Sequence, residues 1–203
     1  EILTCDWSSD VCSSDLETLS SFLAAHPNVS VDLEEHLSDE IVGLIAEGVG
    51  DVGVVAGTVD PGRLTTFPFR TDRFQLVVAQ DHPLAGRNRI AFADALGHDF
   101  IGLDRASAVQ RFLAGKATSA RRALRLRVQL RSFDAVCRLV ERNVGVGVVP
   151  ATTARQAVKT MAIKALDLSD PWALRELTIC VRDFNALPHY AQKLVEHMRA
   201  TPH

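Results

Sequence analysis

The sequence predicts an α/β fold with a mostly parallel sheet. Three observations support this prediction: helical and strand patterns alternate from residue 17 onward, apolar residues make up 47% of the 203 residues, and several short apolar runs are bounded by glycine. No run approaches the ~18–20 apolar residues that a membrane span requires. We therefore expect a soluble globular protein with a substantial core.

The first predicted elements form a strand–helix–strand unit. A short helix over 17–26 ends at a Pro-Asn pair, and apolar and polar residues alternate over 29–33, as in a half-buried strand. Ser38 begins a helix with one apolar stripe, which ends near Gly48. Residues 51–57 form a short apolar run, typical of a buried parallel strand, so we expect a right-handed crossover.

Helical and strand patterns continue to alternate through the rest of the chain. The expected strands cover 63–69, 73–79, 100–103, 124–130, 144–149, 161–166 and 174–182, with turns at 70–72 and 81–85. The expected helices cover 91–96, 107–120, a segment from Ser132, 152–158 and 187–200.

The first sixteen residues differ in composition from the rest. They contain four acidic residues, no basic residue and two of the four cysteines, with neither the basic start nor the apolar middle of a secretory signal. Asp6–Leu16 resembles the translation of a short-read sequencing adapter, so we interpret 1–16 as an artefactual leader. The alternative is a genuine Ser/Asp-rich leader.

Charge and cysteine content exclude several classes of protein. The chain has 22 basic and 25 acidic residues, a net charge of −3; without the leader's four acids, 21 acidic residues remain and the charge is +1. This near-neutral balance gives no excess of positive charge with which the chain would attract nucleic acid. Four cysteines do not make a disulfide scaffold, which favours a reducing, cytoplasmic location.

Four motifs, in order and at consistent spacing, point to a family. They are FLAAHPNVSVDLEE at 22–35, GVGDVGVVAG at 48–57, DHPL at 81–84 after a VVAQ strand, and NVGVGVVP at 143–150. Together they resemble the effector-binding (substrate-binding) domain of LysR-type transcriptional regulators over essentially all of 17–203.

The resemblance implies two Rossmann-like lobes joined by two crossover strands, as in type 2 periplasmic binding proteins. Lobe I would comprise 17–72 plus 177–203, and lobe II 73–176. Comparison with that family also implies that the chain is N-terminally truncated. The winged helix-turn-helix DNA-binding domain is absent, and the first strand of lobe I is missing because the leader stands in its place.

Three serines mark a candidate effector site. Ser38, Ser107 and Ser132 each follow a predicted strand and begin a predicted helix, at the carboxyl ends of strands where ligands bind in α/β sheets. Helix N-termini carry partial positive charge, so converging termini favour a small carboxylate. The alternative is that each serine only caps its own helix.

Three further residues are candidates for the same site. Gly57 would permit close backbone approach, Arg105 could pair with an anion, and Phe133 could form an apolar floor. Each has an alternative: Gly57 could simply form a turn, Arg105 could be a solvated loop residue, and Phe133 could be an ordinary core residue. His36, near Ser38, could sense ligand or pH, or be a partly exposed loop residue.

Catalytic and metal motifs are missing from the sequence. There is no G-x-S-x-G, no Walker A loop and no H-E-x-x-H, and the seven histidines lack ligand spacing, so we expect no enzyme activity, metal or cofactor. Cys137 and Cys180 fit small buried hydrophobic positions. The arginines at 121, 122, 125 and 127 indicate a solvated face more than a nucleic-acid patch.

The resemblance therefore implies the ligand-sensing module of a regulator. A small effector, expected to be a carboxylate, would bind between the lobes and control promoter binding by the full-length protein. The full-length protein would be a homo-oligomer, dimer or tetramer, and would touch DNA only through the missing domain, with no membrane partner. The alternative is a periplasmic solute-binding protein of a transporter, which has the same two-lobe fold.

Overall fold

The chain forms two compact units. A computed structural model describes residues 2–8, 13–36, 38–56, 59–105 and 107–200. Unit 1 comprises Glu1–Thr71 and Arg175–His203, and unit 2 comprises Asp72–Leu174. The chain passes between them twice, within β4 (Thr65–Ala79) and at the start of β10 (Leu174–Val181).

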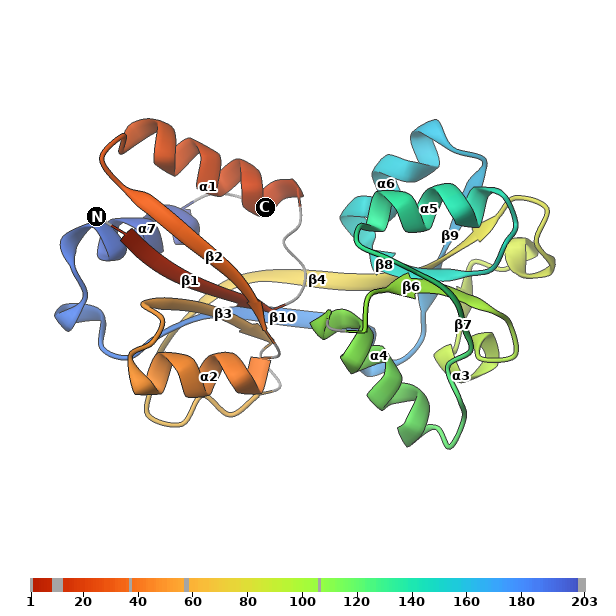
Figure 1. Ribbon diagram of the computed structural model, residues 1–203, viewed down its shortest axis with the longest axis horizontal. Coiled ribbons are helices and arrows are strands. Elements are labelled where there is room, and N and C mark those ends of the chain that lie inside the picture. The colour runs from red at the N-terminus through yellow and green to blue at the C-terminus, as the bar shows by residue number, and fades with distance from the viewer. Residues whose placement is uncertain (1, 9–12, 37, 57–58, 106, 201–203) are drawn as a thin grey trace. The chain divides into compact units, whose positions relative to one another are not determined.

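Unit 1 is a sheet covered by helices on both faces (Figure 1). Its strands follow the order β2-β1-β3-β10, and β4 lies next to β10. Strand β1 is parallel to both β2 and β3, whereas β3 and β10 are antiparallel. The elements are β1 (Ile2–Ser8), α1 (Ser13–Ala25), β2 (Ser30–His36), α2 (Ser38–Glu47), β3 (Val52–Ala56), η3 (Phe184–Ala186) and α7 (His189–Ala200).

The side-chain alternation of β3 explains the three layers of unit 1. Val52 and Val54 pack with α1 and α7, and Val55 packs with Ile41 and Ile45 of α2 on the other face. All five side chains are buried because successive residues of a strand point to opposite faces. Unit 1 therefore has two apolar clusters, one on each face of its sheet.

Unit 2 has one continuous apolar core. Strand β9 pairs with β4 and β5, β8 pairs with β4, and β6 and β7 form a parallel pair that a bridge between Phe100 and Val146 joins to the segment before β8. In this core Phe92 contacts both Phe100 and Trp172 edge to face. The elements are η1 (Pro83–Gly86), β5 (Arg89–Ile90), α3 (Phe92–Ala95), β6 (Phe100–Leu103), α4 (Ala108–Ser119), β7 (Leu126–Leu130), α5 (Phe133–Glu141), β8 (Gly147–Pro150), α6 (Ala151–Thr160), β9 (Ile163–Leu168) and η2 (Pro171–Ala173).

The turn expected at 70–72 is wrong, because β4 runs unbroken for 15 residues. The segment Arg-Thr-Asp contains no glycine, proline or asparagine, and Asp72, its one residue common in turns, does not by itself enforce a reversal. The strand also has pairing partners beyond the expected turn: Phe74–Val77 pairs with β8, and Gln75–Ala79 pairs with β9. The sheets are mixed, since β4 and β10 run antiparallel to their neighbours.

The strand position expected to be missing from lobe I is filled. Residues 2–8, within the segment interpreted above as a leader, form β1. This strand pairs in register with all seven residues of β2, and its Cys5–Trp7 lies opposite Val52–Val54. Backbone pairing requires only free N–H and C=O groups, so a segment of foreign composition can occupy this position.

Candidate functional site

Two candidate loops leave the same edge of unit 2. Strands β6 and β7 are parallel neighbours with Leu103 beside Leu130, and the Asp104 N–H donates to the Leu130 carbonyl at 2.8 Å. The loops that follow lead into α4 and α5, whose N-terminal residues Ser107 and Ser132 were predicted as site residues (Figure 1). The carboxyl ends of the two strands therefore bring these two candidates to one edge, as expected for a ligand site in an α/β fold.

Ser107 has the backbone but not the side-chain contact of a capping residue. Its carbonyl accepts the Arg111 N–H at 3.0 Å, and its own N–H donates to Asp104 O at 2.9 Å. Its Oγ makes no hydrogen bond to the first turn of α4. That oxygen is buried and has no hydrogen-bond partner among the described residues. An unpaired buried hydroxyl costs about 1–3 kcal/mol, so the local structure leaves a polar group available to a ligand.

Gln110 is a second unsatisfied group on α4, and the sequence analysis missed it. Its side chain is only 3% exposed, and its Nε2 has no partner among the described residues. It lines a cavity of about 10 Å³ between α4 and the strands β6 and β7. A Cβ on Gly102 would lie 2.3 Å from Gln110 Oε1, so a glycine is needed to admit the amide here.

A sequence signal for Gln110 existed. Ser107 and Gln110 have the Ser-x-x-Gln spacing of a capping box, in which the serine caps the N3 amide and the glutamine reaches back to the N-cap N–H. The structure forms neither side-chain bond, and Gln110 turns inward instead. Ser107 Oγ and Gln110 Nε2 are thus left without a partner among the described residues at one helix terminus.

Ser132 does cap its helix. Its Oγ accepts the Ala135 N–H at 3.3 Å, and the residue is exposed. Phe133, next in the chain, is half-buried and packs against the core of unit 2. Arg105 is exposed in the loop before α4, whereas Gly57 lies outside the described residues. The residues predicted for the site in unit 2 therefore include a buried serine hydroxyl, a serine that caps its helix, a half-buried ring and an exposed cation.

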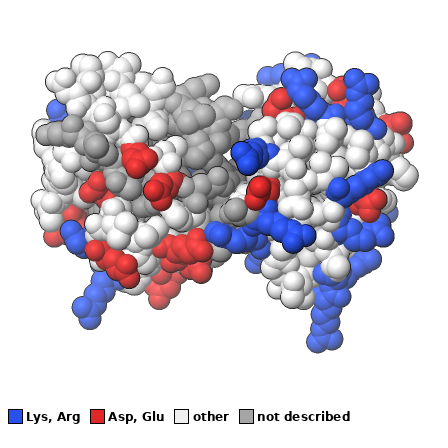
Figure 2. Space-filling view, viewed as in Figure 1, with Lys and Arg blue, Asp and Glu red and all other residues white. Residues whose placement is uncertain are grey.

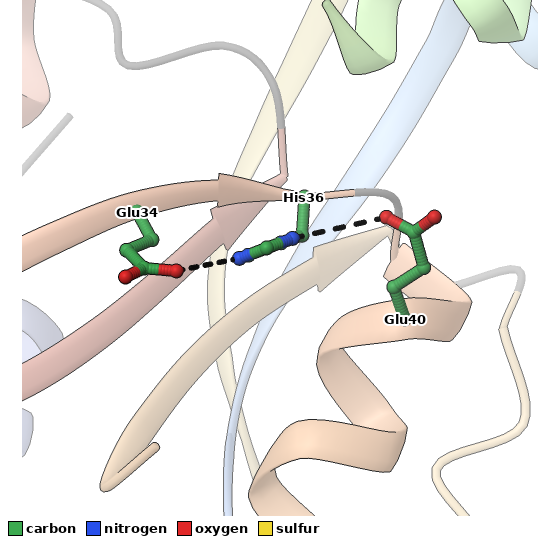
Figure 3. A network of polar contacts seen from close by, with 3 residues as sticks. All are labelled: Glu34, His36 and Glu40. Atoms are coloured by element: carbon green, nitrogen blue, oxygen red, sulfur yellow. Dashed lines mark hydrogen bonds and ion pairs between the residues drawn. The ribbon is translucent and has the colours of Figure 1, made fainter. Parts of the chain in front are cut away.

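Ser38 belongs to unit 1 and has acidic surroundings. It is half-buried and is the first residue of α2, whose first turn contains Asp39 and Glu40. His36 Nε2 lies 2.9 Å from Glu34 Oε2, and its Nδ1 lies 3.8 Å from Glu40 Oε2, so the ring stands between two carboxylates (Figure 3). This acidic cluster is unfavourable for a carboxylate ligand.

The arginines at 122, 125 and 127 hold β7 to its surroundings. They donate to the carbonyls of Ala93, Gly97 and Val144 at 2.8, 3.1 and 3.0 Å. Arg125 also pairs with Asp99 at 3.1 Å while remaining 60% exposed. These contacts give the run a structural role at the beginning of β7 and in the segment before it.

Cys137 and Cys180 are buried thiols that take part in no disulfide. Burial, with a smaller contribution from nearby Asp134, raises the pKa of the Cys137 thiol to about 11, so it stays protonated at neutral pH. Within the described ranges, no three His, Cys, Asp or Glu side chains are placed to hold a metal ion. The helices among these residues include none with the length and apolar character needed to cross a membrane.

The arrangement is that of a ligand-binding α/β protein, and comparison with known proteins identifies its family. Residues 13–202 match the LysR substrate binding domain. A probable RuBisCO transcriptional regulator of Emiliania huxleyi is 24% identical over 179 residues, which are 85% of this chain and 56% of that protein. The chain spans about half the length of the curated relatives it matches.

Solved regulatory domains share the fold. The regulatory domain of Synechocystis PCC6803 CcmR, in complex with 2-PG, superposes with a TM-score of 0.76 at 18% identity and covers 98% of this chain and 96% of that one. The effector binding domain of QuiR, in complex with shikimate, gives a TM-score of 0.68 at 13% identity, covering 98% and 95%.

The chain therefore belongs to the LysR substrate-binding domain family, and its fold is that of type 2 periplasmic binding proteins. The curated relatives are transcriptional regulators, which confirms the resemblance noted in the sequence. The alternative, a transport receptor of the periplasm, is not supported.

Proposed function

We propose that this chain is the ligand-sensing part of a cytoplasmic transcriptional regulator and that unit 2 binds a small organic anion at the carboxyl ends of β6 and β7. The observation that carries the proposal is a pair of buried groups, Ser107 Oγ and Gln110 Nε2, that have no partner in the described part of the chain and lie at one helix terminus. The position of the effector between the two lobes stays a prediction.

The chemistry of the edge favours a carboxylate. The hydroxyl of Ser107 and the amide of Gln110 can both donate, and a carboxylate is an acceptor with several lone-pair sites. The first turn of α4 contains no acidic residue, and its N-terminus adds partial positive charge. Shikimate, the ligand of the QuiR domain, also carries a carboxylate.

Binding would act as a signal without chemical change to the ligand. A ligand shifts a conformational equilibrium only by its differential affinity for the two states. Hydrogen bonds from Ser107 Oγ and Gln110 Nε2 to the ligand would supply such a difference in affinity. These bonds form only in the conformation that places both groups against the ligand. In the longer protein, a DNA-binding domain outside this chain would convert the change into altered promoter binding by a homo-oligomer.

The test is a thermal-shift and calorimetric titration with shikimate, benzoate, citrate and 2-oxoglutarate. We expect at least one of these carboxylates to raise the melting temperature saturably. Ser107→Ala and Gln110→Leu should each weaken the binding of that carboxylate about tenfold, because each variant loses a hydrogen bond to a charged group. Ser119→Ala is the matched control, because Ser119 lies at the exposed end of α4 and its hydroxyl donates to Gly115 O. Equal affinity in all four proteins would contradict the proposal.

A further inference from the structure

Unit 1 contains a pocket on β4 and β10, the two strands in which the chain passes to and from unit 2. The strands are neighbours in the sheet and run side by side in Figure 1. The lining residues lie between 66 and 71 on β4 and at 176–178 on β10, all in unit 1. This crossover pocket measures about 370 Å³, within the range of small-molecule sites, about 300–1,000 Å³.

Strand alternation sets which side chains enter the crossover pocket. Phe67 and Leu177 pack against the apolar cluster of α1 and α7, whereas Leu64 and Cys180 pack with α2 on the other face of the sheet. Successive side chains of a strand point to opposite faces. Five pocket residues are therefore on the α2 face, away from α1 and α7: Thr66, Pro68 and Arg70 of β4, and Glu176 and Thr178 of β10.

Three of these side chains are available to a ligand. Thr66 and Glu176 are exposed and Thr178 is half-buried, and none of the three forms a side-chain hydrogen bond or ion pair within the described parts of the chain. The guanidinium carbon of Arg70 lies 5.3 Å from the centroid of the Phe69 ring, which holds a cation with several N–H donors at the same site. The pocket therefore offers two hydroxyls, one carboxylate and one guanidinium.

The charges of the crossover pocket favour a neutral ligand with several hydroxyl groups. Arg70 and Glu176 together give its lining no net charge. A hydroxyl both donates and accepts, so neighbouring hydroxyls of one ligand can pair with the carboxylate, the guanidinium and the threonines. Pro68 supplies apolar surface for the carbon skeleton of such a ligand. An anion would instead be repelled by the Glu176 carboxylate.

We propose that the crossover pocket binds a small neutral polyol, such as a sugar, through Arg70, Glu176 and the hydroxyls of Thr66 and Thr178. Such a ligand contacts β4 and β10 together, next to the points where the chain passes between the units. The proposal does not depend on the effector site of unit 2, because the pocket shares no residue with it.

The test is an NMR titration of the whole chain with glucose, ribose and inositol, with cyclohexanol as a control that has the carbon ring of inositol and a single hydroxyl. We expect at least one polyol to shift the amide signals of Arg70 and Thr178 saturably and cyclohexanol to bind more weakly. Glu176→Ala should raise the Kd for that polyol about tenfold, because the ligand loses its hydrogen bonds to a charged group. Thr66→Val keeps the shape of the side chain and should raise the Kd about two- to fivefold, the range for one neutral hydrogen bond.

Glu196→Ala is the matched control, because Glu196 is an exposed glutamate of α7 in the same unit, and this variant should leave the Kd unchanged. Three outcomes would overturn the proposal: no shift at Arg70 or Thr178 with any of the three polyols, an unchanged Kd in Glu176→Ala, or equal affinity for cyclohexanol. Polyol shifts confined to the first turn of α4 would also overturn it, because that segment lies in unit 2.

Discussion

At the residue scale, Ser107 and Ser132 show how one residue type at one helix position can have two roles. Both occupy the N-cap of a helix that follows a parallel strand. Ser132 Oγ accepts a backbone N–H, whereas Ser107 Oγ is buried without a described partner. The sequence could not separate them, because the role depends on the rotamer and on the surrounding packing.

Replacing the two serines by alanine should therefore have opposite effects on the ligand-free protein. Ser132→Ala should lower the free energy of unfolding by about 1 kcal/mol, the usual value of a helix cap. Ser107→Ala should leave it unchanged or raise it, because the variant no longer buries an unpaired hydroxyl. Urea denaturation measures both. A loss of 1 kcal/mol or more in Ser107→Ala would show that its hydroxyl stabilises the ligand-free state.

His82, in the DHPL motif, should make stability depend on pH. Its Nδ1 accepts the Leu84 N–H at 3.2 Å, and its ring lies 4.8 Å from that of His98. Burial, with the nearby His98, holds the pKa of His82 below its ordinary value of 6.5, against the opposing effect of Asp81. The unfolded state then binds the proton more readily. The stabilisation is complete above pH 6.5 and is lost as pH falls through the lowered pKa.

His82→Asn should reduce this loss of stability in acid, since an asparagine oxygen can accept the same N–H and does not titrate. The measurement is the urea midpoint at pH 8, 6.5 and 5 for both proteins, with His189→Asn as an exposed-histidine control. An identical fall in midpoint for wild type and His82→Asn would show that other groups account for the acid sensitivity.

At the element scale, glycine lets strands approach closely in the NVGVGVVP segment. A Cβ on Gly145 would lie 2.5 Å from the backbone oxygen of Asp99, which cannot move without disturbing the pairing of Phe100 with Val146. By contrast, Gly43 lies on an exposed part of α2 with nothing within 4 Å of an added Cβ.

Gly145→Ala should lower the free energy of unfolding by about 1–3 kcal/mol or more, the usual cost of overpacking. Gly43→Ala should raise it by about 0.5–1 kcal/mol, because alanine is the better residue inside a helix. Both values come from urea unfolding curves. A tolerated alanine at 145 would mean that the backbone can separate at this strand edge.

The elements were largely predictable from periodicity, and the exceptions have physical causes. The bounds of β6 were predictable from its apolar run. Those of α4 were predictable from the spacing of its apolar residues and from the serine that precedes it. The unbroken β4 was missed because its continuation depends on partner strands that no local pattern reveals. Gln110 was missed for a similar reason: its inward rotamer is possible only where Gly102 leaves room, and that packing is not local in sequence.

At the scale of the whole molecule, charge divides between the two units. Residues 72–174 contain 16 Lys and Arg against 9 Asp and Glu, a charge of +7, whereas 1–71 and 175–203 contain 6 against 16, a charge of −10. Figure 2 shows basic side chains spread over unit 2 and an acidic cluster on unit 1. The near-neutral total of the sequence therefore conceals two oppositely charged units.

This division predicts salt-sensitive self-association. Opposite charges favour contacts of unit 1 of one copy with unit 2 of another, and salt screens such contacts over about 10 Å at 0.1 M. Sedimentation velocity in 50 mM and 500 mM NaCl should show a larger dimer fraction at the lower salt concentration. Association that is unchanged or strengthened by salt would indicate an apolar interface instead.

The central claim is that a carboxylate binds at the first turn of α4, and the most direct measurement is the amide NMR spectrum during titration with the same four carboxylates. We predict that the signals of Val109 and Gln110 shift saturably for at least one ligand and that Ser107→Ala weakens this response. Saturable binding that leaves both signals unchanged, or no binding by any of the four, would contradict the account.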